Sequence, residues 1–321
     1  MRRSGTVPRL GENQRSALLS LFAFGLLFVW FPTVQAATGA TAILAKCALE
    51  QPANEAIQSC TKNLASPNSA ALERLDSLLI RGKAHYSLQQ FSLASTDFKD
   101  ALAIKYSSNI AFFLAASEYN LGNNSEAIKL LSKIVGSGEA TVEVFALRGM
   151  AFQNAGNFDA SIADFDKQLA LDPKSLIALN NRAAARAKKG DYAGAIKDID
   201  SILAINPKMT AALLNRCQFF AREGKFDKGR SSCEEAEKLD PNNYFLLLNI
   251  GAAYYLAHQY ERAIPYYNRS LGLMPGYAPA LYSRGVAEAK IGKEQESQAD
   301  ISAAVRAMPN IGAIMNSAGM K

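Results

Sequence analysis

The sequence has few of the residues on which catalysis and metal binding usually depend. Its 321 residues include two histidines and four cysteines, and the only tryptophan is Trp30. No phosphate-binding glycine-rich loop, nucleophile elbow or zinc-binding His-Glu pair is present. The carboxylates are scattered or stand in slots that recur along the chain, so no general acid–base pair can be picked out. We therefore expect a protein that is not an enzyme and that holds no cofactor and no metal.

An excess of charge of one sign is also missing from most of the chain. The formal net charge is +6, and Arg2, Arg3, Arg9 and Arg15 against Glu12 place half of it within the first 36 residues. The remaining charge is small and dispersed, which argues against nucleic acid as a partner. Hydrophobic residues make up 49% of the sequence, so a buried core is possible throughout.

Only one long apolar run occurs, close to the N-terminus. Ala17–Phe31 follows a basic segment, and it is about 15 residues long, short of the roughly 20 that span a bilayer. Pro32 ends the run, and Val34 and Ala36 supply small residues at positions −3 and −1 of a signal peptidase site. We expect residues 1–36 to be a signal peptide that is cleaved after Ala36, leaving a secreted or periplasmic protein without a membrane span. An uncleaved anchor is the alternative.

What the sequence does contain is a period of 34 residues. Prolines and glycines both keep this spacing, and His258 takes the place of one glycine. The two series are Pro173, Pro207, Pro241, Pro275 and Pro309, and Gly122, Gly156, Gly190, Gly224 and Gly292. Such a period is typical of stacked helix–turn–helix units. Glycine tolerates the left-handed conformation that ends a helix, and proline closes the second helix of each pair.

The period divides the chain into a series of predicted helix pairs. We expect a degenerate N-terminal helical hairpin at 37–74 and a fraying C-terminal tail at 312–321. Between them lie seven repeats, numbered one to seven: 75–107, 108–141, 142–175, 176–209, 210–243, 244–277 and 278–311. A single pair cannot bury both of its faces, so the stack must do so.

The repeats resemble tetratricopeptide repeats. The matching residues are Gly156-Asn157-Phe158, Phe165 and Leu171-Asp172-Pro173 in repeat three, Gly190-Asp191-Tyr192, Ala195-Ile196 and Asn206-Pro207 in repeat four, and Asn249-Ile250-Gly251, Tyr254, Ala263-Ile264 and Pro275 in repeat six. The resemblance implies an all-α, right-handed superhelical solenoid of antiparallel helix pairs whose first helices line a concave face. With the export signal and the segment 56–61, the chain is also similar to exported repeat proteins of the Gram-negative periplasm.

Two slots that lie 16 residues apart change their character together. Four repeats hold Arg and Asp there, repeats two and six hold Leu114 with Leu130 and Ile250 with Tyr266, and repeat five holds Arg216 with Ser232. We predict a salt bridge between the two helices of each Arg–Asp repeat, while a charged ligand groove is the alternative. The four predicted pairs are Arg81–Asp97, Arg148–Asp164, Arg182–Asp198 and Arg284–Asp300.

The cysteines follow the same geometry. Cys217 and Cys233 are 16 residues apart and one position beyond the arginine slot, and Cys47 and Cys60 flank Pro52. Of the three possible pairings, the repeat spacing favours the disulfides Cys47–Cys60 and Cys217–Cys233, which an exported protein would form in an oxidising compartment. Four buried thiols are the alternative.

A series of asparagines on first helices is the candidate binding site. Asn181, Asn215 and Asn249 keep the 34-residue period, and the resemblance implies that they could hold a peptide backbone, since an amide both donates and accepts. Further candidates on the same face are Lys188, Arg222, Tyr255 and Tyr282. The alternative is that asparagine is simply common at this position of the repeat and has no role in binding. The carboxylate clamp of co-chaperones is disfavoured, because Ala211 and Asn215 stand where Lys and Arg would be needed.

These observations favour a non-enzymatic scaffold that binds a protein or peptide on its concave face in a cell-envelope complex. The two histidines, His85 and His258, are interpreted as structural. A self-assembling structural protein, which would form homo-oligomers, and a regulatory or glycan-binding array remain as alternatives.

Overall fold

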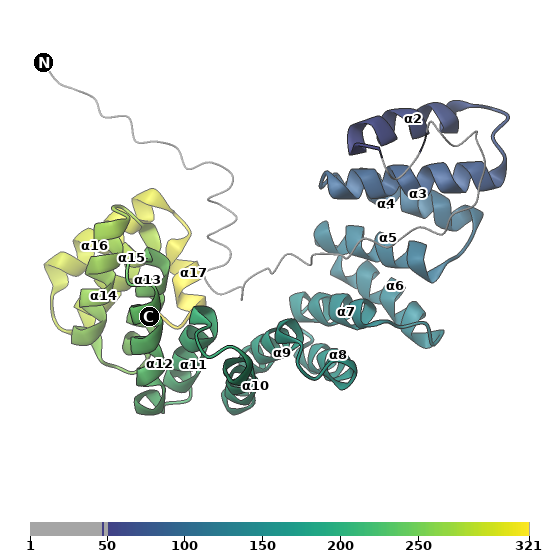
Figure 1. The fold of residues 1–321 in the computed structure, drawn as a ribbon. Helices are drawn as coiled ribbons and strands as arrows, with labels where there is room; N and C mark the ends of the chain where they lie inside the picture. Colours follow the sequence, from purple (N-terminus) through teal and green to yellow (C-terminus); the bar gives the residue numbers. More distant parts are fainter. Residues whose placement is uncertain (1–46, 48–50, 321) are drawn as a thin grey trace, which may run out of the picture. The chain divides into compact units, whose positions relative to one another are not determined.

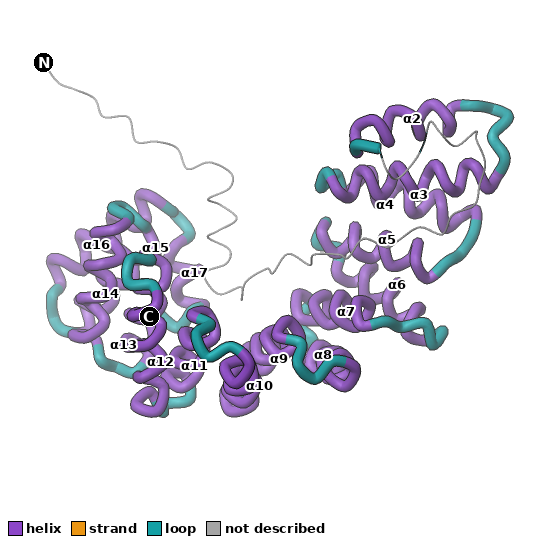
Figure 2. Tube along the Cα trace, in the orientation of Figure 1, coloured by secondary structure: helices purple, strands orange, loops and turns teal. Residues whose placement is uncertain are grey.

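The computed structural model describes Cys47 and residues 51–320. The predicted signal peptide, its cleavage after Ala36 and most of the first half of the degenerate hairpin lie outside these residues. The described residues form sixteen α-helices and no strand (Figure 1 and Figure 2). None of the described helices combines the length and the apolar character needed to cross a bilayer.

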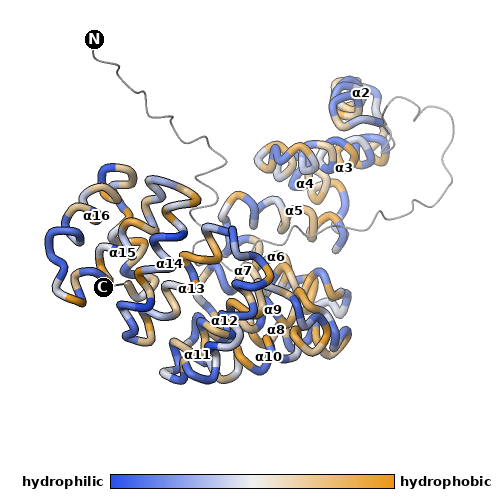
Figure 3. Tube along the Cα trace, turned by 60° about the vertical axis from the view of Figure 1, so that its left-hand side comes forward, coloured by the Kyte–Doolittle hydropathy of each residue, from blue (hydrophilic) through white to orange (hydrophobic). Residues whose placement is uncertain are grey.

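The helices follow the predicted 34-residue period, with two helices to each repeat. Hydrophobic and hydrophilic residues alternate along them, as expected for helices that bury one face (Figure 3). The helices are α2 (Ala53–Ala65), α3 (Ala71–Ser87), α4 (Phe91–Ile104), α5 (Ser108–Asn120), α6 (Asn124–Gly136), α7 (Val142–Asn154), α8 (Phe158–Leu171), α9 (Leu176–Lys189), α10 (Tyr192–Ile205), α11 (Thr210–Arg222), α12 (Phe226–Leu239), α13 (Tyr244–Leu256), α14 (Tyr260–Leu273), α15 (Ala278–Lys290), α16 (Glu294–Ala307) and α17 (Ile311–Ser317).

The turn inside each repeat depends on one residue with positive φ. The five periodic glycines have φ between 75° and 90°, and His258 takes the same place with φ of 58°. A Cβ added at Gly122 would meet no atom within 4 Å, so glycine is favoured there by its backbone conformation and not by lack of space. Between α3 and α4 the corresponding residue is Gln89, with φ of 60°.

Beside the arginine slot, a glycine on the first helix packs against an aromatic ring of the second helix in several repeats. A Cβ added at Gly149 would lie 2.9 Å from the ring of Phe165, and one added at Gly251 would lie 2.6 Å from the ring of Tyr267. These glycines therefore make room for an aromatic side chain on the facing helix. In repeat five the same pair of positions holds Cys217 and Cys233.

The helices belong to two compact regions, and the division falls after Ala178, inside α9. In the N-terminal region α3 pairs with α4, α5 with α6 and α7 with α8, and α4 and α6 each pack against the first helix of the next repeat. In the C-terminal region α11 to α16 repeat this arrangement. The first helices α11, α13 and α15 also contact their neighbours, and α13 is buried from Leu246 to Tyr255.

Both ends of the array differ from what the sequence suggested. Helix α3 begins at Ala71, four residues before the expected start of repeat one, and α2 packs against it. The expectation of a fraying tail at 312–321 is wrong. Residues 311–317 form α17, which packs on α15, and Ile311, Met315 and Met320 are buried. The polar residues of this segment suggested an exposed tail, but its apolar residues lie on one side and pack against the end of the array.

Candidate functional site

The arginine slots lie where the first and second helices of a repeat face each other. The structure brings the four predicted pairs together, with Nη2-to-Oδ1 distances of 2.6–2.8 Å in Arg81–Asp97, Arg148–Asp164, Arg182–Asp198 and Arg284–Asp300. In each pair the arginine Nε donates to the second carboxylate oxygen, which makes the contact bidentate. Asp97, Asp164 and Asp198 are buried. This geometry favours a structural role over a charged ligand groove.

The arginines do more than the predicted two-helix bridge, because they also reach the helix that precedes their repeat. Arg148 Nη1 donates to Ser132 on α6 at 3.3 Å, and Arg284 Nη1 donates to Asn268 on α14 at 2.7 Å. Arg81 likewise donates to Thr61 on α2. We call a first-helix arginine that joins these three helices an arginine staple.

Repeat five contains a staple although it lacks the aspartate. Arg216 Nη1 donates to Ser232 on its own second helix at 2.9 Å, and its Nε donates to Asp200 on α10 at 2.7 Å. The carboxylate has therefore moved from the helix of the same repeat to the preceding one. A comparison of slots within single repeats could not find this contact.

Both predicted cysteine pairs are joined as disulfides. Cys47 and Cys60 lie 4.9 Å apart at Cα and tie residue 47 to α2, and Cys217 and Cys233 lie 5.5 Å apart and join α11 to α12. All four cysteines are buried. Two disulfides fit a protein of an oxidising compartment.

The three asparagines of the first-helix series are not equivalent. Asn249 is 5% exposed, its Nδ2 donates to Phe245 O at 2.7 Å, and its Oδ1 accepts from Gln218 at 3.0 Å. Its amide is therefore engaged within the protein and is not presented to a ligand. Asn181 on α9 and Asn215 on α11 are half-buried.

The other candidate residues of this face also differ in how far they are exposed. Lys188 near the end of α9 is exposed, whereas Tyr255 is buried in the core of the C-terminal region. Tyr282 is half-buried and packs against that core, and a Cβ added at Gly312 would lie 3.5 Å from its hydroxyl. Tyr282 thus lies next to α17.

The C-terminal segment occupies part of the face on which a ligand was expected. Arg222 Nη2 at the end of α11 donates to the main-chain oxygen of Ala318 at 2.9 Å. Gly319 is close to Leu256 on α13, since a Cβ added there would lie 3.2 Å from the leucine side chain. Residues 318–320 therefore lie against the C-terminal ends of α11 and α13, and they cover this part of the first-helix face.

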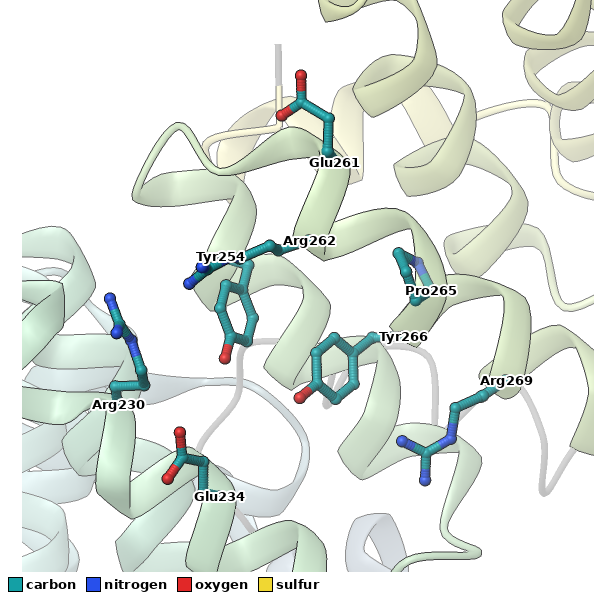
Figure 4. A pocket seen from close by; sticks show the side chains of 8 residues that line it. All are labelled: Arg230, Glu234, Tyr254, Glu261, Arg262, Pro265, Tyr266 and Arg269. Atoms are coloured by element: carbon teal, nitrogen blue, oxygen red, sulfur yellow. The ribbon is translucent and has the colours of Figure 1, made fainter.

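A cleft that sequence reasoning missed lies between the second helices α12 and α14. It has a volume of about 490 Å³, and its lining includes Arg230, Glu234, Tyr254, Arg262, Tyr266 and Arg269 (Figure 4). Two tyrosine rings, from α13 and α14, stack at its base with 5.3 Å between centroids. The only signal in the sequence was the interruption of the Arg–Asp series at Ile250 and Tyr266.

Two of the three arginines at the cleft are held by carboxylates. Arg230 pairs with Asp227, and Arg269 pairs with Glu237. Burial is the largest cause that raises the pKa of Tyr266, and Tyr254 and Glu237 add to it. The Tyr266 hydroxyl therefore stays protonated and donates to Glu237 at 3.1 Å.

An all-α array of helix pairs with a 34-residue period defines the class of this protein, and comparison with known proteins identifies the family. A family model of the tetratricopeptide repeat matches residues 147–210 and 218–278. The matched residues are tetratricopeptide repeats, which confirms the repeat type and the all-α fold class predicted from the sequence. Tetratricopeptide repeat proteins are typically non-enzymatic scaffolds for protein–protein interaction.

Solved structures show the same fold at low sequence identity. One is a tetratricopeptide repeat protein from Parabacteroides merdae, with a TM-score of 0.65 and 16% identity over 77% of this chain and 98% of that one. Another is the C-terminal part of a repeat-containing protein from Cytophaga hutchinsonii, with a TM-score of 0.57 and 20% identity over 71% of this chain and 93% of that one. No curated protein matches the sequence.

Proposed function

We propose that this protein is a non-enzymatic scaffold that binds a protein or peptide segment along the first-helix face of its C-terminal region. Asn181 and Asn215 stand at the same slot of successive first helices, α9 and α11, and both are half-buried. Their amides can donate to and accept from a main chain without regard to its sequence. Lys188, which is exposed on α9, adds a positive charge.

The observation that carries this proposal is that the same face already holds a main-chain segment. Arg222 donates to the carbonyl of Ala318, and Met320 is buried in the hydrophobic core of the C-terminal region. Residues 318–320 thus provide an internal example of the recognition that we propose for α9 and α11. Asn249, Tyr255 and Tyr282 belong to the part of the face that this segment and the core occupy.

The compartment is part of the proposal. The apolar run at 17–31, the small residues before Ala37 and the two disulfides support export to the periplasm or another extracytoplasmic space, and a role in an envelope complex. The run and the cleavage point lie outside the described residues.

Site-specific photocrosslinking tests the binding face. A photoreactive amino acid placed at Lys188 is expected to form crosslinks to a partner protein in intact cells. The matched control position is Lys197, which is exposed on the second helix α10 of the same repeat. Replacing both Asn181 and Asn215 by Ala should reduce the Lys188 crosslinks several-fold.

Equal crosslinking from both positions, or no effect of the double replacement, would contradict the proposal. Crosslinks from Lys188 to a second copy of the chain, together with sedimentation as an oligomer, would instead support a self-assembling protein. Asn249 is left unchanged, because its loss would remove buried hydrogen bonds and could unfold the region.

A further inference from the structure

Repeat six lacks the arginine of the staple but keeps acceptor groups around its position. Ile250 occupies the slot, and Tyr266 lies 16 residues later on the second helix of the same repeat. Glu234 lies 16 residues earlier, on α12. It therefore stands where Asp200 and Asn268 accept hydrogen bonds from the staples of repeats five and seven.

Repeat six also keeps the aromatic ring over which the arginine guanidinium lies in other repeats. In repeats three and five the guanidinium lies over the ring four residues later, at 5.7 Å from the centroid of Phe152 and 5.2 Å from that of Phe220. Four residues after Ile250 stands Tyr254, whose ring stacks on that of Tyr266 with an interplanar angle of 16°. Repeat six thus keeps the ring and, in Glu234, the acceptor on the preceding helix, while Tyr266 stands in place of the aspartate and the arginine is absent.

Within the described part of the chain, two carboxylates of the cleft lining, Glu234 and Glu261, have no ion-pair partner, and Arg262 donates to the Gln259 side chain and not to a carboxylate. Arg230 and Arg269 are paired with Asp227 and Glu237, whereas Glu234 is exposed and has no hydrogen-bond or ion-pair partner within the described part of the chain. Figure 4 shows the Glu234 carboxylate on the same side of the cleft as the two tyrosine hydroxyls. A volume of about 490 Å³ is within the usual range for ligand pockets.

We propose that the cleft between α12 and α14 binds an arginine side chain of a partner protein. In this complex the Glu234 carboxylate accepts from the guanidinium, and the Tyr254–Tyr266 pair provides the surface on which the guanidinium lies. The site is separate from the first-helix face proposed above, because its lining comes mainly from second helices. The chain itself supplies the template, since arginines fill the equivalent slot in five of the seven repeats.

Titration of the full chain with a blocked Gly-Arg-Gly peptide tests the proposal, with tyrosine-labelled NMR spectra as the readout. The peptide should shift the ring signals of Tyr254 and Tyr266 with a dissociation constant of about 1 mM or tighter. The same peptide with citrulline, which keeps the shape of arginine but is neutral, should bind at least about tenfold more weakly. Free arginine as a second probe distinguishes a small-molecule site from one that needs a peptide.

Three variants complete the test. Glu234→Gln should weaken the arginine peptide at least about tenfold, and Glu235→Gln, the exposed neighbour on α12, should leave it unchanged. The double variant Ile250→Arg/Tyr266→Asp rebuilds the Arg–Asp pair of repeats one, three, four and seven. It should retain the fold and abolish binding, because an internal arginine then fills the slot.

Several outcomes would overturn the proposal. They are the absence of saturable binding of the arginine peptide, equal binding of the citrulline peptide, full binding by Glu234→Gln, and stronger shifts with inorganic phosphate or a Gly-Asp-Gly peptide. The last outcome would assign the cleft to anions held by Arg230, Arg262 and Arg269. Circular dichroism of each variant separates loss of binding from loss of fold.

Discussion

Repeats two and six both lack the arginine staple, but the structure fills the two slots differently. In repeat two Leu114 takes the slot and Leu130 faces it, and both pack in a hydrophobic cluster that includes Phe98 of the preceding second helix. Leu114 and Phe98 are 3% and 0% exposed, so this slot is closed by apolar packing. In repeat six Ile250 is equally buried, but the nearby Tyr266 and Glu234 are polar and line a cleft.

The difference lies in the residues around the slot. In repeat two apolar side chains complete a dry core, whereas in repeat six a glutamate, which cannot be buried without a partner, stays at the surface. The polarity of the residues around a missing arginine therefore decides whether the slot becomes core or cleft. Each of the following predictions tests part of this comparison.

The largest effect is expected where a staple is broken. Arg148→Met leaves the carboxylate of Asp164 buried without its partner, and this should lower the free energy of unfolding by about 3–5 kcal/mol. Urea denaturation measures the change. The double variant Arg148→Met/Asp164→Leu should recover most of the loss, because two apolar residues resemble the slot of repeat two. A double variant as unstable as the single one would show that buried charge is not the cause.

A smaller effect is expected at the apolar slot. Leu114→Ala should lower the free energy of unfolding by about 3 kcal/mol, because it leaves a cavity beside Phe98 in a packed core. In repeat six, Glu234→Ala should change stability by less than about 0.5 kcal/mol, because Glu234 is exposed. If the two substitutions had similar effects, the distinction between a closed slot and an open one would be lost.

The sequence allowed much of the scaffold to be predicted, because repetition reveals which residues face each other. The spacing of Arg148 and Asp164, and that of Cys217 and Cys233, was enough to place them on facing helices. The second partner of each arginine was missed, since Ser132, Asp200 and Asn268 keep the 34-residue spacing but differ in residue type. Contacts between repeats do not stand out when each repeat is compared only with its own copies.

The candidate binding face was harder to predict, because it depends on a part of the chain that breaks the period. Asn215 and Asn249 occupy equivalent positions of repeats five and six, yet only the Asn249 side chain accepts a hydrogen bond from Gln218. Residues 318–320 cover part of the face through one main-chain hydrogen bond to Arg222 and the burial of Met320. Neither the length nor the composition of this segment indicated where it would lie.

A change of about 1 kcal/mol or less is predicted at the turns of the same two repeats. Gly122 in repeat two and His258 in repeat six occupy the left-handed region, with φ of 82° and 58°. A side chain in this conformation costs roughly 1–2 kcal/mol, and the greater freedom of glycine in the unfolded chain offsets about 0.4–1 kcal/mol of that. His258→Gly should therefore stabilise the protein by about 0.5–1 kcal/mol, seen as a higher thermal midpoint.

The reciprocal variant Gly122→His is the matched control, and it should lower the thermal midpoint by a similar amount. A Cβ at Gly122 meets no atom within 4 Å, so its cost is conformational and not steric. His258 also lies with Nδ1 2.8 Å from the Tyr260 hydroxyl, in an exposed contact that His258→Gly removes. If His258→Gly destabilised the protein while Gly122→His behaved as expected, this contact, and not the backbone, would account for histidine in the turn of repeat six.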